Sequence, residues 1–339
     1  MHRDILRLQP ADKARLRILF LAKHAKRGGR PHPEDGSHAI YHHEMLETLR
    51  AIGLNVVAAD CYEELFGPVD ADFVIPLLNR GGFQNSEMLA PLLLARAGIP
   101  FLGASPIIRG LSDDKHLMKL AARARGVPCS DWALFRAGRL DPPAPLAGNA
   151  FIVKPNASSA SWGIKRCASW CEVEAHAAAL NARGHDAIAE PWVGTMDIAV
   201  PVIGATDALL LPALGYAPAN SGGLRSYEEK RNLVHAAEDE LLPLADAHLA
   251  ARLDEMVRRL LPELWPFDYG RFEFRYDSRT GELWFMEVNL SCNLWSKKTI
   301  SRSARSVGFD HVALVETILT HSLLRQSVIE RPLALSRAA

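Results

Sequence analysis

Hydrophobic and polar positions follow different patterns in the two parts of this chain of 339 residues. In the first part, short continuous apolar runs alternate with helical patterns, one of which ends near Gly53. The apolar runs that predict buried strands cover 17–22, 55–60, 72–78 and 99–103, and the second helical pattern covers 86–98. Strands that alternate with helices predict a parallel sheet with crossover helices over residues 15–104.

The pattern changes after residue 104. Helices are predicted over 113–126, with Asp113 as the N-cap, and over 171–184, 246–264 and 311–326. Strands are predicted over 151–156, 163–169, 187–193 and 196–204. Two antiparallel strands joined by the polar turn DSRTG are predicted over 270–289, a long loop over 217–232, and a frayed tail after 327. The second part is therefore expected to be a mixed α+β region.

Composition limits the class of protein. An apolar content of 48% and a charged content of 23% describe a soluble globular protein. Lysine plus arginine equals aspartate plus glutamate at 39 each, which gives no electrostatic reason to expect nucleic acid or a membrane as a partner. The N-terminus has no apolar secretory segment, and the five cysteines lack zinc-site spacing, so a cytoplasmic protein with reduced thiols is expected.

The predicted hairpin carries the first candidate chemistry. Arg271 and Glu273 lie two residues apart, as do Glu287 and Asn289, so each pair is expected on one face of its strand. Two carboxylates and an amide are oxygen ligands of the kind that Mg²⁺ prefers, with water and nucleotide phosphates completing the coordination. A surface ion-pair cluster, with Arg271 bound to Glu273, is an equally open interpretation.

A wider set of residues resembles the ATP-grasp enzymes and, within them, the D-alanine–D-alanine ligases. In chain order the set is Lys115, Lys154, Glu190, Lys230, Arg271-x-Glu273 and Glu287-x-Asn289, and the resemblance extends from about residue 72 to 325. It implies an α/β fold with an N-terminal Rossmann-like domain (1–104), a central ATP-grasp subdomain (105–189) and a C-terminal catalytic subdomain (190–330). The C-terminal part would have an antiparallel sheet, and ATP would lie between the last two parts.

The resemblance also implies roles for individual residues. ATP would be bound by Lys115, Lys154, Ser159, Ser161, Glu190, Trp192, Val193, Asp197 and Lys230. Glu273, Glu287 and Asn289 would bind two Mg²⁺ ions, with Mn²⁺ as a substitute. Arg271 would stabilise the oxyanion that forms in the reaction, and Lys230 would close over the triphosphate. The alternatives are solvated lysines at all three positions and core packing for Trp192.

The implied reaction is the ATP-dependent ligation of a carboxylate to an amine, through an acyl phosphate and with release of ADP. Its partners would be small-molecule carboxylate and amine substrates, and a homodimer is the expected assembly. Two alternatives stay open. One is an ATP-grasp cyclase or a ligase with a non-amine nucleophile, and the other is a nucleotide-binding regulator without catalytic activity.

The substrate-binding segments depart from the family pattern. Loop 23–37 is long and basic where the family has a glutamate for the substrate's ammonium group, with Glu34 and Asp35 as candidates. The segment LSCNLW after Asn289 lacks the family's glycine. The candidate substrate ligands are Asn293, Lys297 and Lys298, and for the two lysines a solvated position is equally open. These departures predict a specialised ligase whose product is not D-alanyl-D-alanine.

One further group remains outside this scheme. His38, His42 and His43 have a spacing compatible with a metal site on a helix. A surface or capping role is the favoured interpretation of these histidines.

Overall fold

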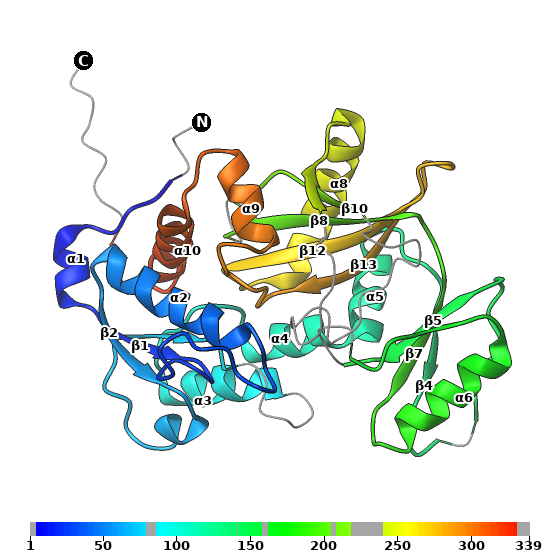
Figure 1. Cartoon of the computed structure of the whole chain (residues 1–339), viewed down its shortest axis with the longest axis horizontal. Coiled ribbons are helices and arrows are strands. Elements are labelled where there is room, and N and C mark those ends of the chain that lie inside the picture. Colours follow the sequence, from blue (N-terminus) through cyan, green and yellow to red (C-terminus); the bar gives the residue numbers. More distant parts are fainter. Residues whose placement is uncertain are drawn as a thin grey trace.

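The computed structural model describes residues 5–78, 86–139, 141–157, 162–204, 208–217 and 240–330. Within these ranges the chain forms one parallel sheet and two antiparallel sheets, each covered by helices (Figure 1). This combination of sheets confirms the predicted mixed α/β class.

The N-terminal sheet has the strand order β2–β1–β3, and both pairings are parallel. Its strands are β1 (Arg17–Leu21), β2 (Asn55–Ala59) and β3 (Phe73–Pro76). Helix α2 (His38–Ile52) connects β1 to β2 and ends at Gly53, whose φ of 94° lies in the left-handed region that favours glycine. The strand predicted over 99–103 is reduced to one bridge, Val74 to Phe101, because the chain turns away at Gly103.

Helices cover both faces of the N-terminal sheet. On one face α2 packs beside α10 (His311–Arg325), and Phe20, Met45 and Leu314 belong to one buried cluster (Figure 1). On the opposite face lies α3 (Leu89–Ala97), whose Leu94 is buried against the sheet. Segments from the two ends of the chain therefore share one core. Shorter helices in this part are α1 (Pro10–Arg15), η2 (Tyr62–Leu65), η3 (Ser86–Met88) and α9 (Thr299–Ser306).

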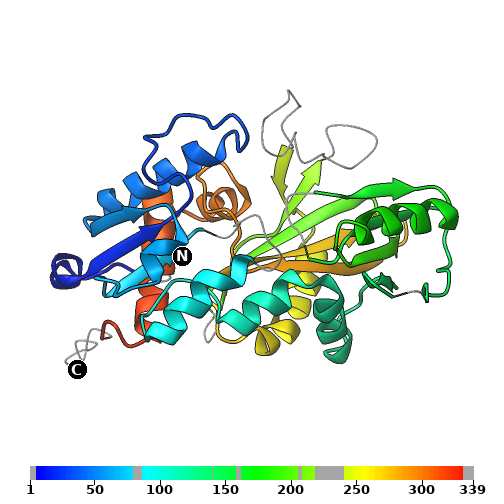
Figure 2. The same ribbon diagram turned by 90° about the horizontal axis from the view of Figure 1, so that it is seen from below.

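Helices α4 (Pro106–Asp113) and α5 (Lys115–Ala124) lead from the N-terminal part to the central sheet, and Figure 2 shows them in succession along one side of the molecule. The predicted N-cap at Asp113 is wrong, because Asp113 is the last residue of α4. Asp114 caps α5 instead, with its carboxylate accepting a hydrogen bond from the Leu117 N–H at 2.9 Å.

The central sheet is small and antiparallel, with the order β4–β7–β5–β6. Its strands are β4 (Ala133–Phe135), β5 (Phe151–Pro155), β6 (Lys165–Cys167) and β7 (Ala187–Pro191). Helix α6 (Trp170–Asn181) buries Val173, Ala177 and Leu180 against the sheet. The domain boundaries expected after residues 104 and 189 stay a prediction, and the second of them lies within β7.

The C-terminal sheet has the order β11–β10–β8–β12–β13, with β9 paired to β8. Its strands are β8 (Met196–Ile203), β9 (Leu209–Leu210), β10 (Leu214–Ala217), β11 (Glu240–Pro243), β12 (Tyr269–Tyr276) and β13 (Leu283–Asn289). Helices α8 (Ala247–Leu260) and η4 (Leu261–Leu264) cover its apolar face, where Leu253 and Phe272 are buried in one cluster. No helix in the described ranges is long and apolar enough to cross a bilayer.

Strands β12 and β13 form the predicted antiparallel hairpin, with a bulge that the sequence pattern did not predict. Glu273 pairs with Glu287, but Phe274 pairs with Phe285, so Met286 is an extra residue on β13. Strict alternation would place Phe285 and Val288 on opposite faces, whereas both are buried in the same cluster. The bulge allows both apolar side chains to face the core.

Asp268 joins three segments that are distant in the sequence. Its buried carboxylate accepts hydrogen bonds from the Gly103 N–H at 2.7 Å and from the Ser322 hydroxyl at 2.6 Å. Arg325 donates two more, at 2.7 and 3.0 Å. Gly103 leads into α4, Asp268 precedes β12, and the other two residues lie on α10. This network therefore connects the C-terminal sheet to the N-terminal part.

We predict that Asp268→Ala lowers the free energy of unfolding by about 3–5 kcal/mol, because it leaves Arg325 without its buried carboxylate. Chemical denaturation monitored by circular dichroism measures the change. The control is Asp310→Ala, which removes only the N-cap of α10 and is expected to cost about 1 kcal/mol. An equal loss in the two variants would show that Asp268 acts only as a local cap.

Candidate functional site

The polar face of the β12–β13 hairpin brings four predicted residues together. Arg271 lies opposite Asn289, and Glu273 lies opposite Glu287. The Arg271 Nε donates to Glu273 Oε1 at 2.8 Å, so the ion pair of the alternative interpretation is present. The Asn289 amide donates to both carboxylates, at 3.2 Å to Glu273 and 3.4 Å to Glu287. The two acids thus converge on one amide group.

Arg271 is held from a second side by two residues that the sequence analysis did not select. Its Nη1 lies 3.5 Å from the Thr299 hydroxyl, which shares a 2.7 Å hydrogen bond with the Tyr216 hydroxyl. Burial lowers the pKa of Arg271, but the charge and hydrogen bond of Glu273, together with Tyr216 and Cys292, raise the pKa above its ordinary value. Arg271 is therefore a permanent positive charge on this face.

Lys115 and Lys154 lie beside the hairpin although they come from different elements. Lys115 Nζ is 3.6 Å from Glu287 Oε2, and its backbone N–H donates to the Asn156 carbonyl at 3.1 Å. Both lysines are buried, which excludes the interpretation that they are solvated surface residues. Burial lowers the pKa of Lys154, but the charges of Glu190, Glu287 and Glu273 raise it above its ordinary value.

Glu190 is the centre of a buried ion-pair triad. Its Oε1 lies 2.7 Å from Lys154 Nζ and its Oε2 lies 2.7 Å from Lys119 Nζ, and the Ser130 hydroxyl donates to Oε2 at 2.9 Å. Burial raises the pKa of Glu190, but the two lysines lower it more, so the carboxylate has a pKa well below the ordinary value. The predicted role of Glu190 in adenine binding stays a prediction.

The segment after Glu190 is organised by Arg275, which the sequence analysis did not select. The guanidinium lies 4.5 Å from the Trp192 ring centroid and donates to the Val193 carbonyl at 3.1 Å. It also donates to the Gly194 carbonyl at 3.2 Å and forms an ion pair with Asp197 at 3.0 Å. Arg166 lies near the same ring, at 4.8 Å from its centroid, so Trp192 is a half-buried partner of two arginines and not an apolar core residue.

The segment after β13 is held by α2. The Glu44 carboxylate accepts hydrogen bonds from the Trp295 indole at 2.9 Å and from the Ser296 N–H at 2.8 Å and hydroxyl at 2.9 Å. The Leu294 N–H donates to the Tyr41 hydroxyl at 3.2 Å. Side chains of α2 thus position a segment that lacks the family's glycine.

The predicted substrate ligands lie in or directly after this segment. The Asn293 side chain accepts a hydrogen bond from the Trp295 N–H at 2.8 Å. Lys297 and Lys298 have their Nζ atoms 5.5 and 5.8 Å from the Trp295 ring centroid. Lys297 is exposed, whereas Lys298 is half-buried at the N-cap of α9. The two lysines therefore differ in their accessibility.

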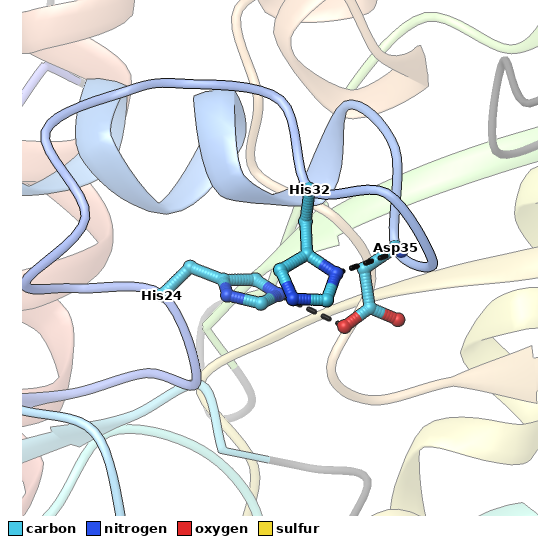
Figure 3. Close-up of side chains that lie close together, drawn as sticks. All are labelled: His24, His32 and Asp35. Carbon is cyan, nitrogen blue, oxygen red and sulfur yellow. Dashed lines mark hydrogen bonds and ion pairs between the residues drawn. The ribbon is translucent and has the colours of Figure 1, made fainter.

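The early loop forms a histidine–carboxylate cluster of its own (Figure 3). Asp35 binds Lys23 at 2.5 Å and the His24 Nε2 at 2.9 Å, and the Asp35 N–H donates to His32 Nδ1 at 3.3 Å. One potential ligand atom from each of His24, His32 and Asp35 lies within 4.8 Å of the others. These atoms are therefore close enough together to bind one metal ion. Hydrogen bonds and the ion pair with Lys23 account for this arrangement, so we assign no metal to it.

The predicted histidine group on α2, at positions 38, 42 and 43, does not lie entirely on the surface. His42 is buried, and its Nδ1 accepts a hydrogen bond from the backbone N–H of His24 at 3.2 Å. The favoured surface or capping interpretation is therefore wrong for His42, which supports the early loop. Of the two acids considered for an ammonium ligand, Glu34 is exposed and Asp35 belongs to the cluster of Figure 3.

Three predicted ATP-binding residues, Ser159, Ser161 and Lys230, lie outside the described residues. Among the residues that the sequence analysis missed, Lys119 had a usable signal. It lies four positions after Lys115 on a predicted helix, a spacing that places both side chains on one face. Arg275 and Glu44 had no comparable signal, because their partners are distant in the sequence.

The residues present fit a hard divalent cation. Glu273, Glu287 and Asn289 offer carboxylate and amide oxygens from adjacent strands, without sulfur or imidazole among them. The nearby cations Lys115 and Lys154 suit the phosphates of a nucleotide. The face thus combines ligands for a metal ion with charges for a polyanion.

Comparison with known proteins reveals relatives over most of the chain. A family model described as the D-Ala–D-Ala ligase C-terminus matches residues 125–320. The D-alanine–D-alanine ligase of Marinomonas sp. is 27% identical over 80% of this chain and 86% of its own length. The corresponding ligase of Desulfovibrio desulfuricans is 26% identical over 81% of this chain and 89% of its own.

The fold has solved counterparts as well. The crystal structure of the D-alanine–D-alanine ligase from Bacillus anthracis complexed with ATP aligns with a TM-score of 0.70 at 18% identity. The alignment covers 92% of this chain and 99% of that chain. This likeness confirms the fold that the sequence resemblance implied.

We predict that the Glu190 triad makes stability depend on pH. Because the pKa of Glu190 is lower in the folded state, its contribution is complete above the ordinary glutamate pKa of about 4.3 and is lost as the pH falls below it. Glu190→Gln should lower the free energy of unfolding at pH 7 by about 3–5 kcal/mol. The difference from the unmodified protein should become smaller in acid.

Denaturant unfolding at pH 7, 5 and 3.5 measures this effect. The control is Glu255→Gln, which removes a largely exposed carboxylate paired with Arg259 on α8 and should change little at any pH. A constant difference between Glu190→Gln and the unmodified protein across the three pH values would contradict the assignment.

Proposed function

Because the chain belongs to the family defined by the D-Ala–D-Ala ligase C-terminus, we propose that it is an ATP-dependent, ADP-forming ligase that makes a C–N bond. One small substrate supplies a carboxylate and the other supplies an amine. The observation that carries the proposal is the convergence of Arg271, Glu273, Glu287 and Asn289 on one face, beside two buried lysines.

The first step transfers the γ-phosphoryl group of ATP to the substrate carboxylate, which yields an acyl phosphate and ADP. This step brings a triphosphate close to a carboxylate, so cations have to offset the repulsion. Lys115 and Lys154 supply two of these charges. Glu273, Glu287 and Asn289 are the residues that would hold Mg²⁺, and the ion would supply positive charge that offsets the charge of the phosphates.

In the second step the amine attacks the acyl carbon. A C–N bond forms, the C–O bond to phosphate breaks, inorganic phosphate leaves and the amine loses a proton. Negative charge develops on the acyl oxygen in the tetrahedral intermediate. Arg271 is suited to stabilise this charge because it stays protonated and is oriented by Glu273 and Thr299.

The product is proposed to differ from D-alanyl-D-alanine. Support comes from the segment after β13, which lacks glycine and is anchored by Glu44 and Tyr41 on α2. Two lysines, Lys297 and Lys298, follow this segment. We further propose that the ligase acts in a specialised pathway. Its acceptor substrate would carry an acidic group that binds near Lys298.

We predict that Glu287→Gln reduces substrate-dependent ADP release by more than about 100-fold. Mutation of a residue that only supports a metal ligand typically lowers activity or metal affinity about 10–100-fold, and loss of a ligand itself should cost more. ADP and phosphate are measured with ATP and Mg²⁺ over a panel of amino acids, hydroxy acids and amines, and mass spectrometry identifies the products. The matched control is Glu282→Gln, an exposed residue just before β13 that should keep full activity.

Two outcomes would overturn parts of this proposal. Tight ATP binding without ADP release for any acceptor would favour a nucleotide-binding regulator. Product formation from a single substrate, or from a hydroxy acid but no amine, would favour a cyclase or a ligase with a non-amine nucleophile.

We predict that Lys298→Met raises the acceptor KM by about 10-fold or more, since a hydrogen bond to a charged group contributes about 1.5–3 kcal/mol. The value of kcat should change less. Lys297→Met is the control, because Lys297 is exposed and follows the same tryptophan. Equal KM values for both variants and the unmodified protein would mean that neither lysine binds substrate.

A further inference from the structure

Arg109 is a buried cation, and two of its side-chain nitrogens have no hydrogen-bond partner among the described residues. The residue lies in α4 and is 4% exposed. The two nitrogens are the Nε and Nη1 atoms, which are both buried and have no partner in the described part of the chain. A guanidinium carries five N–H donors and a charge that cannot be removed near neutral pH. Burial of such a group without compensation costs several kcal/mol.

Other buried cations of the described residues are compensated. Lys119 and Lys154 bind Glu190, and Arg275 binds Asp197 and two backbone carbonyls. Arg109 therefore differs from these buried cations, each of which is paired with a carboxylate. Unsatisfied buried groups in native proteins are uncommon, and a functional role or a bound ion is among the features that account for them.

The surroundings of Arg109 locate it between the N-terminal sheet and the hairpin. Its positive charge acts on Tyr62, Tyr269 and Cys292, where it opposes the rise in pKa that burial causes. The Tyr62 hydroxyl donates to the Leu78 carbonyl at 3.1 Å, just beyond the carboxyl end of β3. Ligands of parallel α/β sheets bind outside this edge.

Cys292 connects this location to the proposed catalytic face. The charges of both Arg271 and Arg109 act on its thiol. Cys292 lies in the segment after β13, one residue before the candidate ligand Asn293. Two arginines, one bound to Glu273 and one unpartnered, thus lie near the same short segment.

We propose that Arg109 binds a carboxylate group of the substrate, distinct from the carboxylate that is activated beside Arg271. This inference rests on the proposed ligase function and specifies its substrate class, an amino acid or similar molecule with an additional acid group. A guanidinium pairs well with a planar carboxylate, and its single charge balances the single charge of that group. The bound acid would supply the compensation that the protein's own groups do not.

The test compares ligand-free stability and carboxylate binding. Arg109→Met removes the charge and keeps much of the apolar stem, so its Tm without ligand should equal or exceed that of the unmodified protein. The probe is sodium acetate, titrated against sodium chloride at constant ionic strength. Acetate should raise the Tm of the unmodified protein by roughly 2 °C or more relative to chloride. It should not raise that of Arg109→Met.

Two further variants sharpen the result. Arg109→Lys keeps the charge but loses the planar fork, and should retain part of the acetate effect. Arg96→Met, an exposed site on α3, should retain all of it. A Tm of Arg109→Met several degrees below that of the unmodified protein, or its failure to fold, would show a structural arginine and overturn the proposal. An acetate effect that is absent from the unmodified protein, or unchanged in Arg109→Met, would overturn it as well.

These measurements need neither ATP nor turnover. A failed acetate test with intact ADP release would refute the role of Arg109 alone. Loss of ADP release with every substrate, together with a positive acetate test, would instead refute the proposed ligase function.

Discussion

Buried carboxylates hold this protein together, because each one requires cations or N–H groups that come from other parts of the chain. Glu190 on β7 binds lysines of α5 and β5. Asp268 binds α10 and the segment that leads into α4. Glu316 on α10 binds Lys13 at 2.7 Å and the Leu8 N–H at 3.1 Å. A buried charge without such partners is costly, so these contacts define how the helices and sheets meet.

The same requirement shapes the proposed site. Glu287 and Glu273 belong to a strand pair whose other face packs in the core. The bulge at Met286 allows both acids to lie on the polar face while Phe285 and Val288 are buried in the core. Lys154 lies between two sets of acids, because the charges of Glu190 and Glu287 both act on it. The central sheet is thereby tied electrostatically to the C-terminal sheet, with charges already oriented for a polyanionic ligand.

The departures from the family pattern have structural substitutes. The segment after β13 has no glycine turn, and Glu44 and Tyr41 position its backbone instead. On the early loop Asp35 is engaged by Lys23 and His24, and Glu34 is exposed. Arg109 is the exception to charge compensation in the described interior, and a ligand-binding role explains why a protein would tolerate that cost.

Local pattern determined most of the elements of this chain. Apolar periodicity predicted the parallel sheet, helices α2, α8 and α10 and the β12–β13 hairpin, because burial of one face imposes a period on the sequence. The spacing of two residues placed Arg271 with Glu273, and Glu287 with Asn289. The N-cap of α5 was misassigned because two aspartates stand side by side.

Tertiary structure alone decided which charges meet. Arg275 and Glu44 carry no local signal for their partners, because those partners lie tens to hundreds of positions away. Nothing in the sequence around Arg109 indicates that its buried charge is left uncompensated by the described residues. The bulge at Met286 likewise depends on what the partner strand and the core require. A sequence pattern records which face is buried, whereas the compensation of a buried charge depends on three-dimensional proximity.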